Sequence, residues 1–232
     1  MHPALRPLPG VRPRPARPRT TAARLARALA VCVLGYALIW LTTALSILGA
    51  SAWARGHANA GRTLSGIQHF QQVDDRVYRG SAPREAGYRA LAERGITTVV
   101  DLRAEHLTRR QLVLPEKAGL RVVRLPVRDG QTPKAAQVEQ FLRTVRDAPG
   151  PVFVHCGAGV GRTGSMAAAY LVRTGQTDGD GALLRMVAVG PPSVEQMYYA
   201  ATARPDRSAQ PPGLVQALSR ALDAPRRISH YF

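Results

Sequence analysis

The sequence predicts an α/β fold: a central, mostly parallel sheet flanked by helices and preceded by one transmembrane helix. From about residue 73 onward, short apolar and β-branched segments alternate with helical segments, as expected for a parallel sheet that is covered by helices. Ahead of them, residues 28–54 run for 27 residues without a charge, and about 20 apolar residues are enough to cross a bilayer. The length of 232 residues leaves room for one ordinary domain with extensions.

The composition argues against several classes of partner. The formal net charge is +17, and the first 55 residues hold eight arginines and no acid. No aromatic side chains are interleaved with a basic stripe, so we expect no nucleic-acid partner. Cys32 and Cys156 are the two cysteines, which are too few for a Cys/His zinc cluster or a disulfide framework. We therefore expect no metal and no cofactor.

The N-terminal part reads as a basic arm followed by a membrane anchor. Residues 1–27 are rich in proline and arginine, and we expect a disordered arm. The alternative for residues 28–54 is a cleaved signal peptide, because "ASA" at 50–52 and "ANA" at 58–60 fit a small-residue cleavage pattern. The apolar stretch is about twice the usual length of a signal peptide's apolar region, which favours the anchor.

The distribution of arginines predicts the orientation of this anchor. Seven arginines precede the apolar stretch, whereas Arg55 and Arg62 are the basic residues that closely follow it. The positive-inside rule keeps the arm in the cytoplasm. We expect a single-pass protein of the cell membrane, with everything after residue 54 on the extracytoplasmic side.

The rest of the chain divides into a linker, a domain and a tail. We expect a juxtamembrane linker at 55–72, a domain at 73–202, and a C-terminal helix and tail at 203–232. Residues 76–80 predict a short edge strand, and 151–154 the innermost strand. Further strands are expected at 96–102 and 120–127, and helices at 83–94, 105–118, 134–148, 162–175, 180–190, 193–200 and 213–224.

The segment "HCGAGVGRTG" at residues 155–164 carries the chemistry. It lies between the innermost strand and a helix, and in open α/β sheets ligands bind beyond the carboxyl ends of the strands. Its glycines let the backbone curl so that successive amides point at one anion. Arg162 could hold two phosphate oxygens, and the same amides and cation would favour a reactive thiolate at Cys156.

This segment resembles the signature loop of the cysteine-dependent protein tyrosine and dual-specificity phosphatases: His-Cys, five residues, Arg, then Ser or Thr. The resemblance covers roughly residues 73–202. It includes "RVYRGSAP" and "TVVDLR", which are similar to the opening elements of compact bacterial-type members. The first 55 residues lie outside it.

The resemblance implies a role for each matching residue. Cys156 attacks phosphorus to give a cysteinyl-phosphate, and Arg162 binds the equatorial oxygens. Thr163 donates a hydrogen bond to the sulfur as it leaves, and His155 orients the loop and tunes the thiol. Backbone amides bind the phosphate along the loop formed by Gly157, Ala158, Gly159, Val160, Gly161 and Arg162.

The leaving group needs a proton, and Asp129 in "LPVRDGQTP" stands where the family's general-acid aspartate usually lies. The alternative for Asp129 is a turn or cap residue beside Gly130. Asp101 is a rival acid, although its setting favours a structural tie to Arg103. Glu195 and Gln196 could position the hydrolytic water, but solvation of a helix explains them equally well.

The expected function is a membrane-anchored phosphatase that hydrolyses phosphotyrosine in proteins, with phosphoserine and phosphothreonine as further candidate substrates. Relatives that act on phosphoinositides often carry lysines at the positions of Ala158 and Val160, so apolar residues there favour phosphoprotein or aryl phosphate. A phospholipid or inositol phosphate phosphatase is the alternative. An inactive phosphate-binding scaffold and a rhodanese-like sulfur transferase are further alternatives.

Overall fold

The computed structural model describes residues 19–207 and 210–228. The boundary between two compact units falls between Thr43 and Ala44, inside helix α1 (Arg19–Ala54). Residues 1–18 of the expected basic arm lie outside the described residues. Residues 19–27 of that arm are helical, because alanine, leucine and arginine favour a helix and the last proline of the arm is Pro18.

Helix α1 contains the apolar stretch that the sequence analysis singled out. The segment Thr21–Arg55 has a mean hydropathy of 2.1 over its most apolar window, and by length and composition it could cross a membrane. Within the described residues it is the one helix that meets both criteria. The helix ends at Ala54, the residue at which we expected the apolar segment to end.

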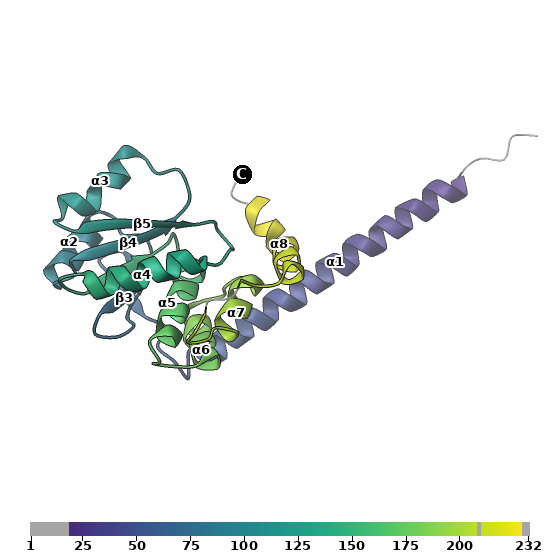
Figure 1. Ribbon diagram of the computed structural model, residues 1–232. Coiled ribbons are helices and arrows are strands. Elements are labelled where there is room, and N and C mark those ends of the chain that lie inside the picture. Colours follow the sequence, from purple (N-terminus) through teal and green to yellow (C-terminus); the bar gives the residue numbers. More distant parts are fainter. Residues whose placement is uncertain (1–18, 208–209, 229–232) are drawn as a thin grey trace, which may run out of the picture. The chain divides into compact units, whose positions relative to one another are not determined.

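A six-stranded sheet forms the centre of the second unit (Figure 1). Its strand order is β1-β2-β3-β6-β4-β5, with β3, β6, β4 and β5 mutually parallel and β1 and β2 antiparallel to their neighbours. All four residues of β6 are buried, which confirms that 151–154 marks an inner strand. The strands are β1 (Arg62–Leu64), β2 (Ile67–Gln72), β3 (Val77–Gly80), β4 (Thr98–Arg103), β5 (Arg121–Val127) and β6 (Val152–His155).

The expectation that residues 76–80 form an edge strand is wrong. β3 lies inside the sheet, between β2 and β6. β1 and β2 fall in the range 55–72, where we expected a linker. The sequence does not reveal β2 because it is largely polar, and Ile67 and Phe70 are its two buried apolar residues.

Helices cover both faces of the sheet. Apolar residues of α2, with Leu114 of α3, pack on the face that presents Val99 and Phe153. Apolar residues of α4 and α5 pack on the opposite face, against Val100 and Val154. The helices are α2 (Glu85–Glu93), α3 (Arg109–Lys117), α4 (Ala135–Asp147), α5 (Gly161–Arg173), α6 (Gly179–Val189), α7 (Val194–Ala201) and α8 (Gly213–Ile228).

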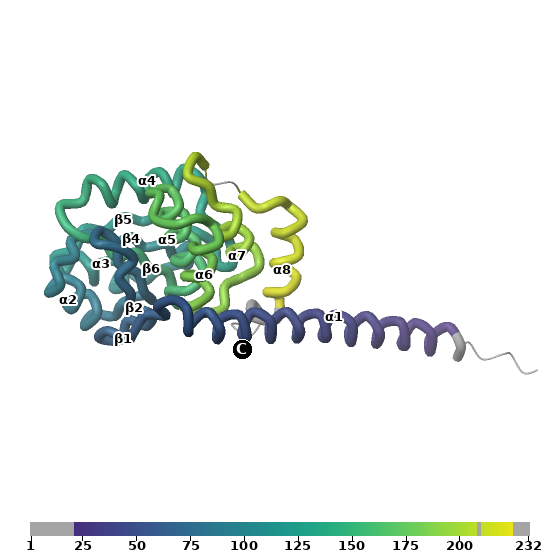
Figure 2. The backbone as a smooth tube through the Cα atoms, turned by 90° about the horizontal axis from the view of Figure 1, so that it is seen from below, coloured from purple at the N-terminus to yellow at the C-terminus, as the bar shows by residue number. Residues whose placement is uncertain are grey.

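A helical layer extends from α5 through α6 and α7 to α8 (Figure 2). The last turn of α1 belongs to the same unit as this layer. The Ser51 hydroxyl donates a 2.7 Å hydrogen bond to the Val187 carbonyl of α6, and Ala54 is buried against Val187 and Ala188. The end of α1 is therefore fixed to α6.

Candidate active site

Four loops meet at one edge of the sheet. They follow the carboxyl ends of β3, β4, β5 and β6, which are parallel and therefore point the same way. The loops after β4 and β5 supply Glu105 and Asp129, and the loop after β6 supplies Cys156. This edge is where ligands bind in open α/β sheets.

Cys156 lies at the bottom of a cavity at this edge. Its side chain is 3% exposed, and it lines a space of about 210 Å³ together with Asp129 and Arg162. The backbone N–H of Gly159 donates to Cys156 Sγ at 3.3 Å. The cysteine therefore borders a cavity whose lining mixes apolar residues with Arg162, Asp129 and Asp223.

Two glycines of the loop are required by close contacts. Gly159 has φ +78°, and a Cβ at this position would collide with the Gly80 carbonyl group of β3. A Cβ on Gly161 would collide with the carboxamide of Gln196. The loop after β6 is therefore packed tightly between β3 on one side and α7 on the other.

Arg162 is held by hydrogen bonds from both of its terminal nitrogens. It is the second residue of α5 and 4% exposed. Nη1 donates to Glu105 Oε2 at 2.8 Å and Nη2 donates to Glu105 Oε1 at 2.7 Å, which is the paired geometry that guanidinium and carboxylate groups favour. Nη1 also donates to the Val127 carbonyl at 3.2 Å.

Charges around Arg162 keep it protonated. Burial by itself would lower its pKa, but the hydrogen bond with Glu105 and the nearby charges of Cys156 and Asp129 raise the pKa above its ordinary value. In turn, the Arg162 hydrogen bond lowers the pKa of Glu105, against a smaller opposing effect of burial. The pair is a fixed cation and anion at neutral pH.

Glu105 was not among the predicted site residues. We expected a helix from residue 105, but Thr108 caps α3 through a capping box with Gln111, so the helix begins at Arg109 and Glu105 stays in the loop. A carboxylate four residues after Asp101, beyond the end of a predicted parallel strand, was the available signal.

Asp129 and Asp101 have different environments. Asp129 lines the cavity with a side chain that is 76% exposed, and its Oδ1 lies 3.2 Å from Arg162 Nη2. Asp101 is buried, and its carboxylate accepts hydrogen bonds from the Arg103 backbone N–H at 2.9 Å and from Nη2 at 2.8 Å. The structural interpretation of Asp101 is confirmed.

His155 and Thr163 are fully buried. Burial lowers the pKa of His155 to about 4, although the charge of Asp101 partly opposes this, so the ring is neutral near pH 7. Its Nδ1 lies 3.1 Å from the Cys156 carbonyl oxygen. Thr163 is also buried, and its hydroxyl has no hydrogen-bond partner among the described residues. The hydrogen bond from Thr163 to the sulfur is therefore absent here.

Helix α7 fixes the loop that carries Asp129. Gln196 Nε2 donates to the Gln131 carbonyl at 3.0 Å, and the Ser193 hydroxyl donates to the Gly130 carbonyl at 2.8 Å. Glu195 and Gln196 are 4% and 3% exposed, so solvation of a helix does not explain them. Gln196 also lines the cavity.

Arg79 of β3 lies behind the loop. It is 3% exposed, and its Nη2 donates to the carbonyls of Gly159 at 2.9 Å and Val160 at 3.3 Å. Burial lowers the pKa of Arg79 to about 10, while the charge of Cys156 raises it. The buried guanidinium holds the loop from the side opposite to the cavity.

A metal-binding cluster of three or more His, Cys, Asp or Glu residues is not found in the described part of the chain. The groups at this edge include a thiol, a guanidinium, backbone amides and the carboxylates of Glu105, Asp129 and Asp223, the last of which reaches the cavity from α8. Together they suit binding of a tetrahedral anion next to a sulfur nucleophile.

Comparisons with known proteins agree with this arrangement. A family model described as "Polymorphic toxin system, DSP-PTPase phosphatase" matches residues 73–176. Among curated proteins, the tyrosine-protein phosphatase cdc-14 of Caenorhabditis elegans is 31% identical over 105 residues, which are 45% of this chain and 14% of that protein. NAD kinase 2, chloroplastic, of Arabidopsis thaliana is 37% identical over 99 residues, 40% of this chain and 10% of that protein. The chain spans about a tenth of the length of the first such relatives.

Solved structures share the fold. The core catalytic domain of the PP-IP phosphatase SIW14 from S. cerevisiae has a TM-score of 0.51 at 19% identity, over 59% of this chain and 86% of that one. A variant of TpbA from P. aeruginosa, in complex with pTyr, has a TM-score of 0.50 at 25% identity, over 68% of this chain and 98% of that one.

Proposed function

We propose that this protein is a phosphatase of the dual-specificity and protein tyrosine phosphatase superfamily, whose family model matches residues 73–176, and that it hydrolyses phosphomonoesters through a cysteinyl-phosphate on Cys156. The observation that carries the proposal is the cavity that Cys156, Arg162 and Asp129 line together. It joins a nucleophile, an anion-binding cation and an acid at the N-terminus of a 13-residue helix.

The first step transfers the phosphoryl group to sulfur. The substrate phosphate lies against the backbone amides at the start of α5, where the helix dipole favours an anion, and Arg162 binds two of its oxygens. Cys156 Sγ attacks phosphorus, the S–P bond forms and the P–O bond to the leaving group breaks. The leaving oxygen takes its proton from Asp129, whose exposed carboxyl lies at the mouth of the cavity.

The second step returns the enzyme to its starting state. A water molecule attacks phosphorus, Asp129 takes a proton from it, and the S–P bond breaks to release phosphate and the thiolate. Thr163, whose hydroxyl has no partner among the described residues, donates to the departing sulfur after its side chain turns about the Cα–Cβ bond. His155 is a positioning residue, because its ring contacts the carbonyl of Cys156 and remains neutral.

We infer that Glu105 is a second positioning residue. A phosphate in the cavity displaces Asp129 from Arg162 Nη2, whereas the paired hydrogen bonds to Glu105 keep the guanidinium in place. An arginine that is already oriented loses less side-chain entropy when the substrate binds. Glu105 therefore acts through Arg162.

The proposed substrate is phosphotyrosine in a protein. The cavity of about 210 Å³ is smaller than the usual pocket for a whole small ligand, roughly 300–1,000 Å³. It suits a phosphorylated side chain whose protein remains outside. Ala158 and Val160, which line the cavity, offer no cation for further phosphates of an inositol ring. The pTyr complex of TpbA supports the same choice.

We also propose that α1 anchors the protein in the cell membrane as a single-pass helix, with the phosphatase domain on the extracytoplasmic side. The seven arginines before residue 28 support this orientation. A reporter enzyme that is active only outside the cytosol, fused after Phe232, should be active. Activity of a cytosol-dependent reporter at the same position would overturn the orientation.

The activity is tested with the full chain in an uncharged detergent, under reducing conditions and with a metal chelator. We expect turnover of p-nitrophenyl phosphate that disappears in Cys156→Ser and falls by about 10²–10³-fold in Arg162→Ala. Cys32→Ser removes the other cysteine and is the matched control, which should keep full activity. Equal activity of the two serine variants would refute Cys156 as the nucleophile.

Substrate choice is tested by comparing kcat/KM for a phosphotyrosine peptide, a phosphoserine peptide and a phosphatidylinositol phosphate in mixed micelles. We expect the phosphotyrosine peptide to have the highest kcat/KM of the three. A higher kcat/KM for the lipid would favour the phospholipid phosphatase over the phosphotyrosine phosphatase.

A further inference from the structure

A second cavity lies away from the active site and is lined by cations without acids. Its volume is about 490 Å³, within the usual range of ligand pockets. It shares no lining residue with the cavity that contains Cys156. The described residues that line it include Arg79, Arg185 and His57, and none of them is Asp or Glu.

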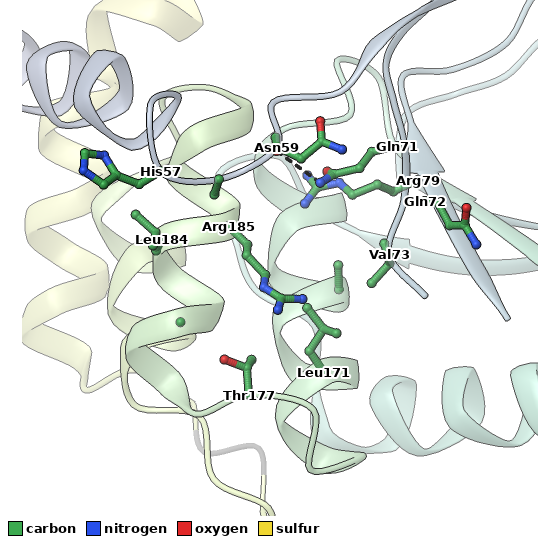
Figure 3. Close-up of a pocket in the computed structure, with 13 residues that line it drawn as sticks. His57, Asn59, Gln71, Gln72, Val73, Arg79, Leu171, Thr177, Leu184 and Arg185 are labelled. Carbon is green, nitrogen blue, oxygen red and sulfur yellow. Dashed lines mark hydrogen bonds between the residues drawn. The ribbon is translucent and has the colours of Figure 1, made fainter. Parts of the chain in front are cut away.

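The two arginines enter this cavity from different elements (Figure 3). Arg79 comes from β3, and Arg185 comes from α6 and extends toward Leu171 and Thr177. Arg185 is exposed, and its side chain makes no ion pair or hydrogen bond among the described residues. Two cations that face one space without a carboxylate repel each other, so an anion between them would be stabilised.

One hydrogen-bond donor of Arg79 is buried and has no partner among the described residues. The residue is 3% exposed, and the donor is its Nε. An unpaired buried donor of a charged group destabilises the folded protein. The two carbonyls that Nη2 contacts do not balance a full positive charge. Arg79 forms no ion pair among the described residues, although the charge of Cys156 acts on it, and its side chain borders the cavity.

The lining of the cavity is mixed. Asn59, Gln71 and Gln72 contribute side-chain amides that can bind phosphate or polyol oxygens, and Ala167, Leu171 and Leu184 contribute apolar surface. This composition suits a phosphate-bearing group that is joined to a short apolar segment. His57 lies two residues after Arg55, where the candidate membrane span ends.

We propose that this cavity is a second anion site, which binds the phosphate of an amphiphilic molecule between Arg79 and Arg185. The chemistry fits the head group of an anionic phospholipid, and it also fits a free phosphate ester. Binding itself does not depend on the proposed catalytic activity.

An occupant of this cavity can also influence the active site through Arg79. Arg79 Nη2 holds the carbonyls of Gly159 and Val160, and the N–H of Gly159 donates to Cys156 Sγ. An anion at Arg79 neutralises its charge and weakens its hold on these carbonyls. Occupancy therefore lowers kcat/KM by about 3- to 10-fold through weaker support of the thiolate. This second part rests on the proposed function.

Binding is tested with the full chain in an uncharged detergent, in the Arg162→Ala background that disables phosphate binding at the active site. Equilibrium dialysis with radiolabelled orthophosphate should detect one remaining site. Adding Arg185→Ala, or the charge reversal Arg185→Glu, should weaken it by at least 10-fold. Arg121→Ala removes an exposed arginine that does not line the cavity and is the matched control, which should leave binding unchanged.

A lipid arm distinguishes the sources of the phosphate. The Arg162→Ala protein and its Arg185→Ala derivative are reconstituted in nanodiscs of phosphatidylcholine with or without phosphatidylglycerol. If less orthophosphate binds in discs that contain phosphatidylglycerol, the natural occupant is a lipid head group. If orthophosphate binds equally in both kinds of disc, the natural occupant is a soluble phosphate ester. The proposal is overturned if the Arg185→Ala and Arg121→Ala variants bind orthophosphate or lipid equally well. It is also overturned if neither orthophosphate nor lipid binds to the Arg162→Ala protein.

The effect on catalysis is measured separately, with otherwise unaltered protein in the same two kinds of nanodisc. We expect phosphatidylglycerol to lower kcat/KM for p-nitrophenyl phosphate, and Arg185→Ala to remove this inhibition. If the protein has no phosphatase activity but still binds phosphate in a manner that depends on Arg185, the proposed function is refuted and the second anion site is supported. Inhibition that persists in Arg185→Ala would refute the route through Arg79.

Discussion

Replacing Glu105 tests whether Arg162 must be held before the substrate arrives. Glu105→Gln keeps the shape of the side chain but removes its charge and one of the two oxygens that accept from Arg162 at 2.7 and 2.8 Å. Arg162 keeps the Val127 carbonyl at 3.2 Å as a partner. The variant therefore loosens the guanidinium without leaving it unpaired.

The size of the effect follows from the environment of the pair. A hydrogen bond to a charged group contributes about 1.5–3 kcal/mol. The side chain of Arg162 is 5% exposed but that of Glu105 is 51% exposed, so solvent screens part of the interaction. We therefore expect a loss of about 1–2 kcal/mol of transition-state stabilisation, which is about 5- to 30-fold in kcat/KM.

The assay compares kcat and KM of Glu105→Gln with those of Glu116→Gln, which removes an exposed acid from α3. A loosened Arg162 raises KM for p-nitrophenyl phosphate and lowers kcat, whereas a loss of folded protein lowers kcat alone. The same kcat/KM in the two variants would refute the positioning role of Glu105.

The pH dependence gives a second test of the same residue. The hydrogen bond from Arg162 lowers the pKa of Glu105 below its ordinary value of 4.5. A carboxyl with a lowered pKa stabilises the folded site fully above its ordinary pKa of 4.5, and this stabilisation is lost as the pH falls through the lowered pKa. The ratio of kcat/KM of wild type to that of Glu105→Gln should therefore be constant above pH 4.5 and become smaller below it.

Three further predictions concern other residues of the site. Asp129→Asn should lose about 10²-fold in kcat on alkyl phosphates and much less on p-nitrophenyl phosphate, whose leaving group needs no proton; equal losses on both would move the acid role elsewhere. The pKa of His155 is about 4 in the folded protein against 6.5 ordinarily, so the unfolded state binds an extra proton between these values. Urea denaturation should show stability falling by on the order of 3 kcal/mol as the pH drops from 6.5 to 4, and a flatter profile in His155→Asn. Gly159→Ala should destabilise the protein by about 2 kcal/mol more than Gly175→Ala, because both have positive φ but a Cβ meets the backbone of β3 only at Gly159; equal losses would show that the loop is not packed as described.

Local sequence was enough to predict the loop that contains Cys156. The apolar strand, the glycines and Arg162 are contiguous, so their order in the sequence already fixes their order around the cavity. Asp129 was also predictable, because it follows the carboxyl end of a strand that runs parallel to β6. Each of these inferences depends on a short segment.

Residues that act across the sheet were not predictable in this way. Arg79 reads as an exposed residue of an edge strand, and it is buried because the polar strand β2 adds a further neighbour to β3. Glu105 depends on where α3 begins, and the capping box at Thr108 decides that. Gln196 depends on the contact between α7 and the loop of Gln131, which lies 65 residues earlier in the chain. Tertiary contacts, rather than local pattern, determine all three.

Trapping the intermediate tests the central claim, that the thiolate of Cys156 itself accepts the phosphoryl group. The full-length enzyme is mixed with excess p-nitrophenyl phosphate, quenched within the first turnover and digested, and the peptide that contains residue 156 is analysed by mass spectrometry. We predict one added phosphoryl group on Cys156, formed as fast as p-nitrophenol is released and absent from Cys156→Ser. Release of p-nitrophenol by wild type with no phosphoryl group on this peptide at any quench time would contradict the account.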